Sequence, residues 1–275
     1  MAHPDGLPLA DAFLGLMHEQ RVQIRFELTY QEHMRLDAAL ALADEKRRNA
    51  VAWSALEPNV STWVTGALLA SGMQLREITA DPKAITPAIR KAIPKEAMAA
   101  LLKGRMPDAG FGLLGGSGVG KTATLAALLR AWADGWLRTV GPTTAASIRP
   151  ASLALVWANW PEFVAAGKGS LSQDRGAEAE GAVIDAMGAG VLVLDDLGRE
   201  RVRGSYTEDW GTAQLDRVVD HRDRRGLLTF WTSNLSTTDL ASHLGAGLVS
   251  RLARLAPPVI LPATLPDRRT AGLAS

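Results

Sequence analysis

Residues 115–122 read GGSGVGKT, and this stretch decides the fold because it matches the pattern G-x-x-x-x-G-K-[ST] in full. The apolar run 111–114 precedes it, and residues 121–134 have the spacing of an amphipathic helix. Such glycines let backbone N–H groups surround a β-phosphate, while Lys121 reaches the β and γ phosphates and the Thr122 hydroxyl ligates Mg²⁺. A glycine-rich turn without function is the alternative, and the flanking strand and helix argue against it. We therefore predict binding of ATP with Mg²⁺ by Gly115, Gly116, Ser117, Gly118, Val119, Gly120, Lys121, Thr122 and Ala123.

The composition describes an ordinary globular chain of 275 residues, 47% apolar and 21% charged, which is long enough to bury a core. It contains no cysteine, so disulfides, thiolate zinc sites and cysteine nucleophiles are excluded. No apolar run is long enough to span a membrane, and the first twenty residues do not read as a signal peptide. We expect a cytoplasmic protein without a membrane segment.

The charge is unevenly distributed along the chain. Residues 1–80 carry 7 Lys and Arg against 10 Asp and Glu, whereas residues 81–275 carry 23 against 19. This contrast is a mild indication that the second part contacts nucleic acid.

Short apolar runs alternate with stretches of helical spacing in the second part of the chain. This alternation predicts an α/β fold in which a five-stranded parallel sheet is covered by helices on both faces. The expected strands are 111–114, 152–158, 191–195, 227–232 and 258–261, and the expected helices are 121–134, 161–187 with a break at GKGS, 206–224 and 237–255.

The first part of the chain has helical spacing and a different organisation. Residues 57–63 (EPNVSTW) and 79–87 (TADPKAITP) hold turn and capping residues that we expect to interrupt the helices. We predict a helical partner-binding module over 1–80, a linker over 81–108 and an ATPase domain over 109–275.

Polar residues follow two of the expected strands. Asp195 and Asp196 end the run VLVLDD, and the carboxyl end of a parallel strand lies beside the phosphate loop. Asp195 can therefore hold the magnesium and Asp196 can face the attacking water, unless both are simply solvated acids at a strand exit. Asn234 follows the next run; it can orient the water or sense the γ-phosphate, or it can belong to a turn that caps the next helix.

Arg251 and Arg254 lie three residues apart on the last expected helix. They form either a solvated helix face or, with the nucleotide of a neighbouring subunit within reach, part of a catalytic site.

The order of these motifs resembles the AAA+ ATPases, and more narrowly the DnaC/IstB-like helicase-loader group, over about residues 105–270. The stretches VVDHRDRRGLLTFWTSNL (218–235) and LGAGLVSRLARL (244–255) carry the likeness beyond the phosphate loop. The resemblance implies a three-layer AAA+ P-loop sandwich, preceded here by the small helical module, with no helical lid after the last strand.

The resemblance also implies roles for the residues of the site. Asp195 and Asp196 would form the Walker B pair, Asn234 would be sensor I, and Arg251 would reach the ATP of the adjacent protomer in an ATP-bridged oligomer. Arg268 or Arg269 would be a second sensor, and the sequence does not decide between them.

The resemblance also implies a regulated ATPase that would load a replicative helicase onto single-stranded DNA, with the amino-terminal module binding the helicase. Because Asp196 is one methylene shorter than Glu and would hold the water less closely, we expect slow turnover. Basic, hydroxyl and aromatic side chains suit contact with DNA, although core packing or a solvated loop explains each of them as well. The DNA-binding candidates are Phe163, Lys168, Ser170, Arg199, Arg201, Arg203, Ser205 and Tyr206.

Three alternatives remain open. An IstB-like transposition ATPase would use the same site with a transposase as its partner. A P-loop kinase would be a monomer with a substrate pocket and no response to DNA. A nucleotide-binding interaction protein would barely hydrolyse ATP.

Overall fold

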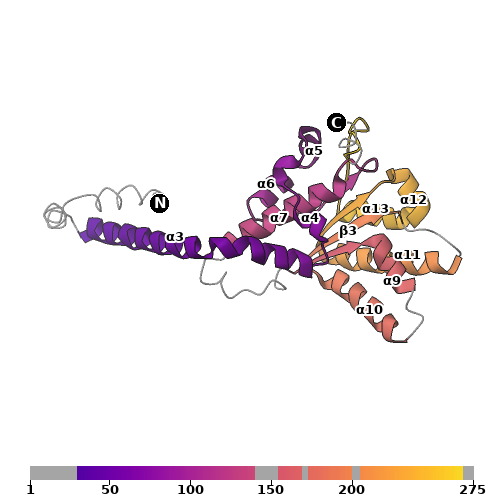
Figure 1. Cartoon of the computed structure of the whole chain (residues 1–275), viewed down its shortest axis with the longest axis horizontal. Coiled ribbons are helices and arrows are strands. Elements are labelled where there is room, and N and C mark those ends of the chain that lie inside the picture. Colours follow the sequence, from indigo (N-terminus) through magenta and orange to yellow (C-terminus); the bar gives the residue numbers. More distant parts are fainter. Residues whose placement is uncertain (1–29, 140–153, 169–172, 200–204, 269–275) are drawn as a thin grey trace. The chain divides into compact units, whose positions relative to one another are not determined.

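The computed structural model describes residues 30–139, 154–168, 173–199 and 205–268 (Figure 1). The chain forms two compact units, of which the first comprises 1–59 and 141–147 and the second comprises the rest. The described residues of the first unit form the amino-terminal part of helix α3 (Tyr30–Ala70). The sheet and the other helices belong to the second unit.

Five strands form one parallel sheet in the second unit, as the sequence predicted, in the spatial order β2-β3-β4-β1-β5. Because β1 lies between β4 and β5, the loop that follows it starts from inside the sheet. Strands buried on both faces read as continuous apolar runs, which is why the sequence revealed them. The strands are β1 (Gly112–Leu114), β2 (Leu155–Asn159), β3 (Val191–Leu197), β4 (Leu228–Ser233) and β5 (Pro258–Ile260).

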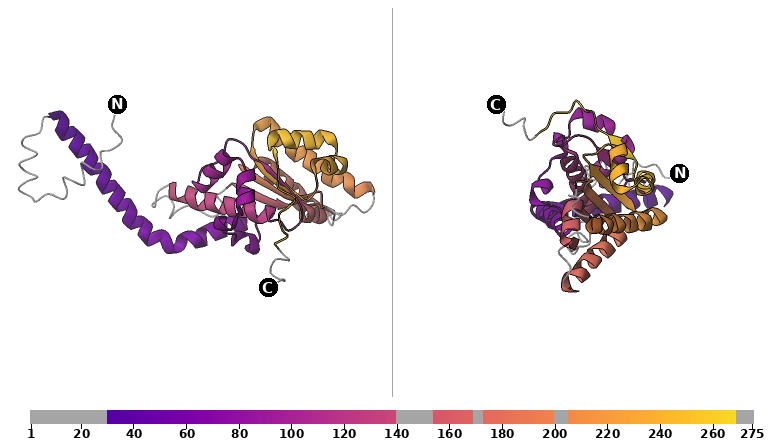
Figure 2. Two further views of the ribbon diagram at one scale, coloured as in Figure 1. Left: turned by 90° about the horizontal axis from the view of Figure 1, so that it is seen from above. Right: turned by 90° about the vertical axis from the view of Figure 1, so that its right-hand side faces the viewer.

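Helices cover both faces of the sheet, so the predicted three-layer arrangement is confirmed (Figure 2). On one face α7 (Lys121–Thr139) packs against β4, with α4 (Leu75–Ile78) and α6 (Lys95–Leu102) against α7. On the other face a continuous apolar core joins Leu194 and Trp231 of the sheet to five helices. These helices are α9 (Trp160–Lys168), α10 (Gln173–Gly188), α11 (Ser205–Arg225), α12 (Thr237–Leu244) and α13 (Ala246–Leu255).

The region expected to be a single helix over 237–255 contains two helices. Gly245, with φ of +91°, separates α12 from α13 because a left-handed residue ends a helix. The Ser236 hydroxyl accepts a hydrogen bond from the backbone N–H of Asp239 at 3.1 Å and caps α12. Capping is thus done by Ser236, and Asn234 is left for another role.

One expectation about the helices of the first 108 residues was wrong. Helix α3 is not interrupted at 57–63 but continues to Ala70, since Val64 and Leu68 bury an apolar face beyond that point. The expected linker 81–108 is helical and packed: it contains η1 (Pro82–Ala84), α5 (Pro87–Ala92) and α6, and its isoleucines at 85, 89 and 93 are buried.

A buried arginine joins three elements of the second unit. The Arg222 side chain of α11 is fully buried and donates hydrogen bonds to the carbonyl oxygens of Ala186, Ala189 and Leu228. It also donates to the Thr229 hydroxyl at 2.9 Å. Burial lowers the pKa of Arg222 to about 10, so the guanidinium stays charged at neutral pH. These bonds tie the end of α10 and the start of β4 to α11.

Within the described residues, the structure holds no helix that combines the length and the apolar character needed to cross a membrane.

Candidate active site

The phosphate loop joins the end of β1 to the first residue of α7, at the carboxyl edge of the sheet. Gly118 and Gly120 adopt φ values of +74° and +99°, which side chains rarely tolerate. Helix α7 begins directly after this loop, and the amino terminus of a helix favours binding of an anion. The local geometry is therefore the one that the motif requires for phosphate.

Lys121 lies at the centre of the site and is buried, with 6% of its surface exposed. Its Nζ donates to the carbonyl oxygens of Gly115 at 2.7 Å and Gly116 at 2.8 Å. It also donates to Oδ1 of Asn234 at 2.6 Å. The ammonium group is thus held over the loop by oxygen atoms that phosphate oxygens can replace.

Asp195 is buried, with 2% of its surface exposed, at the point where β3 meets this edge. Its Oδ1 accepts hydrogen bonds from the hydroxyls of Thr122 at 2.9 Å and Thr232 at 2.7 Å. Burial raises the pKa of Asp195 to about 6; the two hydroxyl bonds oppose this rise, and the negative charges of Glu77 and Asp196 add to it. A cation beside this carboxylate would relieve its unfavourable charge.

The structure brings together Thr122 and Asp195, the two expected magnesium ligands. Both offer oxygen atoms, which Mg²⁺ prefers, and Mg²⁺ commonly uses few protein ligands and completes its shell with water and phosphate oxygens. The donor set therefore fits a magnesium ion bound together with a nucleotide. In the part of the chain that the structure describes, no group of three or more His, Asp or Glu forms a separate metal site.

Asp196 stands on a β-bulge. Leu194 pairs with Trp231 and Leu197 with Ser233, so Asp195 and Asp196 together face Thr232 alone. Asp196 takes a left-handed conformation with φ of +65°. The bulge turns two consecutive carboxylates toward the same edge of the sheet, where a regular strand would point them to opposite faces.

Three hydrogen bonds hold Asp196 in this unusual conformation. Its backbone N–H donates to the Thr232 hydroxyl at 2.9 Å, and its Oδ1 accepts from Nδ2 of Asn234 at 2.7 Å. Its Oδ2 pairs with Nη1 of Arg199 at 2.7 Å. Asn234, directly after β4, therefore joins Lys121 to Asp196 through the two ends of one amide group.

Thr232 is a site residue that the sequence reading did not assign, although its hydroxyl bonds to both Asp195 and Asp196. Thr232 lies two residues before Asn234. Polar residues at strand ends are common, so its position in the sequence gave only a weak indication of a role in the site. Its role becomes visible only when β3 and β4 are paired.

Arg251 and Arg254 lie on α13 and pair with carboxylates of α11 in the same chain. Arg251 contacts Asp216 and lies 3.5 Å from Asp220, and Arg254 contacts Asp223. The contact with Arg254 lowers the pKa of Asp223. About a third of the Arg251 side chain remains exposed.

The segment after β5 crosses the phosphate loop. The backbone N–H of Arg268 donates to the carbonyl oxygen of Gly118 at 3.0 Å, and Nη2 of Arg268 donates to the carbonyl oxygen of Ala84 at 3.3 Å. A side chain at Gly120 would come within 3.0 Å of the Arg268 guanidinium. The structure thus places Arg268 at the loop, whereas Arg269 lies outside the described residues.

The structure describes the side chains of two predicted DNA-binding residues, Phe163 and Arg199. Phe163 stacks with both Trp160 and Trp210, with ring centroids at 4.9 and 6.0 Å, so its ring already packs within the chain. Arg199 is exposed and pairs with Asp196. Ser170, Arg201 and Arg203, and the side chains of Lys168, Ser205 and Tyr206, lie outside the described part of the structure.

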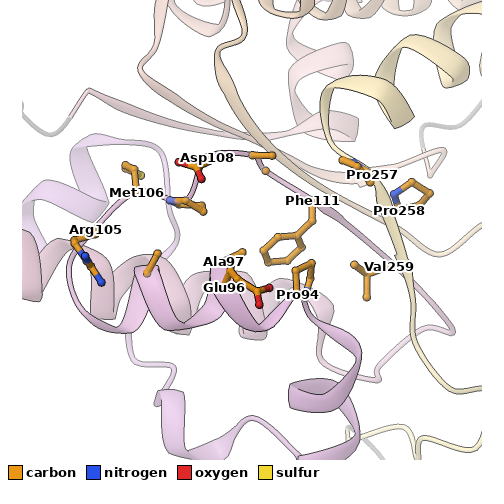
Figure 3. Close-up of a pocket in the computed structure, with 14 residues that line it drawn as sticks. Pro94, Glu96, Ala97, Arg105, Met106, Asp108, Phe111, Pro257, Pro258 and Val259 are labelled. Carbon is orange, nitrogen blue, oxygen red and sulfur yellow. The ribbon is translucent and has the colours of Figure 1, made fainter.

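A pocket of about 560 Å³ lies at the other end of the sheet, where β1 and β5 begin (Figure 3). Figure 3 shows Phe111 between a helix that carries Ala97 and the strand with Val259. Pro94 and Pro258 complete a mostly apolar lining. The pocket is therefore separate from the phosphate loop.

No family model matches the chain, and no curated protein matches it either. The DnaC helicase loader and DnaI are among the solved structures that are similar to it. The DnaC helicase loader is 22% identical, with a TM-score of 0.49, over 69% of this chain and 100% of the other. DnaI is 24% identical, with a TM-score of 0.51, over 71% of this chain and 94% of the other. The chain therefore shares its fold with DnaI, and the predicted α/β fold with a five-stranded parallel sheet is confirmed.

Proposed function

We propose that this protein is an ATP-dependent DNA replication protein that loads a replicative helicase onto single-stranded DNA. The observation that carries the proposal is the network in which Asn234 joins Lys121 to Asp196 beside the buried Asp195. The fold shared with DnaI and the motif resemblance to the helicase-loader group support the choice of this ATPase class.

ATP binding is assigned to residues 115–123, with Lys121 exchanging its carbonyl contacts for phosphate oxygens. Thr122 and Asp195 would hold magnesium, which neutralises charge on the phosphates when it is bound. Asp195 is ionised more readily beside a cation, so the buried carboxylate and the metal stabilise each other.

Hydrolysis is assigned to Asp196, whose carboxylate accepts the proton of the attacking water or orients that water. Asn234 couples this carboxylate to Lys121, so a change at the γ-phosphate is transmitted to the position of Asp196. Because two donors already hold both carboxylate oxygens, turnover in the resting protein is slow.

Arg251 is proposed to act on the ATP of a neighbouring protomer, since its contacts in its own chain are to α11 rather than to the phosphate loop. Such an arginine can contribute about 10³ to 10⁵ in rate by stabilising charge on the transferring phosphoryl group. The active site would then be complete only in an ATP-bridged oligomer. The guanidinium of Arg268 lies against Gly120 of the phosphate loop, and Arg268 is proposed as the second sensor within the same chain.

The partners follow from the same proposal. Residues 1–80 would bind the replicative helicase, and Arg199 and its neighbours would contact single-stranded DNA. An IstB-like ATPase would instead bind a transposase through residues 1–80. A pull-down with the purified full-length chain against a hexameric helicase and against a transposase separates these two, and retention of the transposase alone would contradict the loader proposal.

The main test is ATP turnover with and without single-stranded DNA, measured beside the molecular mass in the presence of ATP. We expect DNA-stimulated turnover, an ATP-dependent increase in mass, and a loss of turnover in Arg251→Ala that leaves ATP binding intact. Arg217→Ala is a matched control, because Arg217 forms a surface ion pair with Glu180. Turnover insensitive to both DNA and Arg251→Ala would favour a P-loop kinase, and binding without turnover would favour a nucleotide-binding interaction protein.

A further inference from the structure

A tight turn directs the Arg199 side chain back onto Asp196. The backbone N–H of Arg199 donates to the carbonyl oxygen of Asp196 at 3.3 Å, and Gly198 between them has φ of +82°. A Cβ at Gly198 would lie 2.5 Å from Cδ1 of Leu235 and would be strained at this φ, so glycine is favoured at this position. The turn is therefore built into the end of β3.

The contact itself uses the carboxylate oxygen that Asn234 leaves available. Nη1 of Arg199 lies 2.7 Å from Oδ2 of Asp196, while Nδ2 of Asn234 bonds to Oδ1. The Asp196 side chain is 16% exposed, but the Arg199 side chain is 64% exposed. One end of this ion pair is thus in the active site and the other end is in contact with solvent.

We propose that Arg199 is a positioning residue that restrains Asp196 in the resting protein, and that a phosphate of single-stranded DNA withdraws it. The inference rests on the proposed function and adds to it a route from DNA to hydrolysis. While Arg199 is paired with Asp196, the carboxylate is a poorer acceptor for the proton of the attacking water. When Arg199 leaves, the Asp196 carboxylate keeps its hydrogen bond from Asn234 at Oδ1, and Oδ2 faces the water.

The exchange of partners is chemically favourable. An ion pair with an exposed arginine contributes little to stability, so a competing anion can replace its carboxylate partner. Guanidinium groups bind phosphate oxygens through two parallel hydrogen bonds, and a DNA strand presents phosphates at high local density. Proton transfer is not required for the exchange, because the guanidinium stays charged in both states.

The kinetic test compares Arg199→Ala, Arg199→Lys and the control Arg217→Ala for kcat and KM of ATP, with and without a short oligothymidylate. Without DNA we expect Arg199→Ala to raise kcat about two- to fivefold, the factor that loss of an exposed ion pair supplies, at unchanged KM. Added DNA should raise it no further. Arg199→Lys should restore much of the restraint, and Arg217→Ala should behave as the unmodified protein.

A lower basal kcat in Arg199→Ala, or a normal response of that variant to DNA, would overturn the inference. If an acidic peptide stimulates the unmodified protein and oligothymidylate does not, DNA is the wrong partner. The proposed function is judged separately by whether the unmodified protein hydrolyses ATP at all.

A second measurement does not depend on turnover. In ¹⁵N-labelled protein, the Arg199 Nε–Hε signal, identified by its loss in Arg199→Ala, should move both in Asp196→Asn and when oligothymidylate is added. An Arg199 signal that moves in neither case would refute the restraint even if the protein is an active ATPase.

Discussion

Oδ1 of Asn234 lies 2.6 Å from Nζ of Lys121, so the residue after β4 contacts the first residue of α7 directly. The other end of the same amide donates to Asp196. Only one orientation of the amide satisfies both partners, since an ammonium group has no acceptor and a carboxylate has no donor. Asn234 thus links the phosphate-binding side of the site to the hydrolytic side.

Replacing Asn234 with alanine should reduce turnover far more than ATP affinity. The change leaves residues 115–123 intact but frees both Lys121 and Asp196, and loss of one preorganised polar group in an active site costs about 10²-fold or more in kcat. Steady-state kinetics and ATP titration measure the two effects. Asn159→Ala is the matched control, because the Asn159 amide oxygen accepts a hydrogen bond from the backbone N–H of Glu162 at 3.2 Å, outside the Lys121–Asp196 link. A large loss of affinity with normal kcat would contradict the assignment.

Asp196→Asn should bind ATP normally and abolish hydrolysis, because asparagine retains the left-handed conformation but cannot accept a proton. Asp196→Glu should keep or raise turnover, since the longer side chain still carries a carboxylate. It should also lose about 1 kcal/mol of stability, because φ of +65° is less costly for Asp and Asn than for Glu. Thermal unfolding and turnover measure both effects, and loss of ATP binding in the asparagine variant would place Asp196 on the metal side.

Asp195 should make the stability of the nucleotide-free protein depend on pH. Its pKa is about 6 in the folded protein against an ordinary 3.8, so the folded state holds a proton that the unfolded chain releases. Stability should therefore fall as pH rises from about 4 to about 6, by roughly 2 to 3 kcal/mol in all.

Asp195→Asn should remove the pH-dependent loss of stability that ionisation of the buried carboxylate causes. Urea unfolding is expected to find the variant more stable than the unmodified protein at pH 7.5, with a smaller difference at pH 4.5. Asp134→Asn is the control, since Asp134 is exposed and pairs with Arg138 on α7. If the stability gained by Asp195→Asn over the unmodified protein were smaller at pH 7.5 than at pH 4.5, the linkage between Asp195 and folding would have the opposite sign.

Arg222→Leu should destabilise the fold by about 3 kcal/mol or more, because several buried carbonyl groups lose their donor together. Chemical denaturation measures the loss. Arg224→Leu on the same helix removes a largely exposed arginine and should change stability by about 0.5 kcal/mol or less. Equal effects of the two substitutions would mean that the buried bonds of Arg222 contribute nothing measurable.

Arg268→Ala should lower kcat/KM for ATP. Arg269→Ala is the comparison, because the sequence did not decide which of the two arginines is the second sensor. Arg268 lies against Gly120, so we expect Arg268→Ala to lower kcat/KM for ATP by about tenfold, as loss of one charged hydrogen bond does. A loss confined to Arg269→Ala would assign the second sensor to Arg269 instead.

Local patterns determined much of the architecture. The pattern around Lys121 identified the phosphate loop, and continuous apolar runs identified the five strands, because parallel strands are buried on both faces. Tertiary burial overrode local signals in the first part of the chain. Residues 57–63 contain turn formers, yet α3 continues there because Val64 and Leu68 bury an apolar face beyond them.

By itself, the sequence determined the residue types of the site and the edge of the sheet where they meet, since both depend on short-range pattern and strand direction. Only the tertiary structure decided the pairing of β3 with β4, which places Thr232 beside both aspartates and creates the bulge at Asp196. It also explains why the second acid is Asp: its backbone is left-handed, a conformation that Asp adopts more readily than Glu. Such contacts join residues more than thirty positions apart, and no local spacing encodes them.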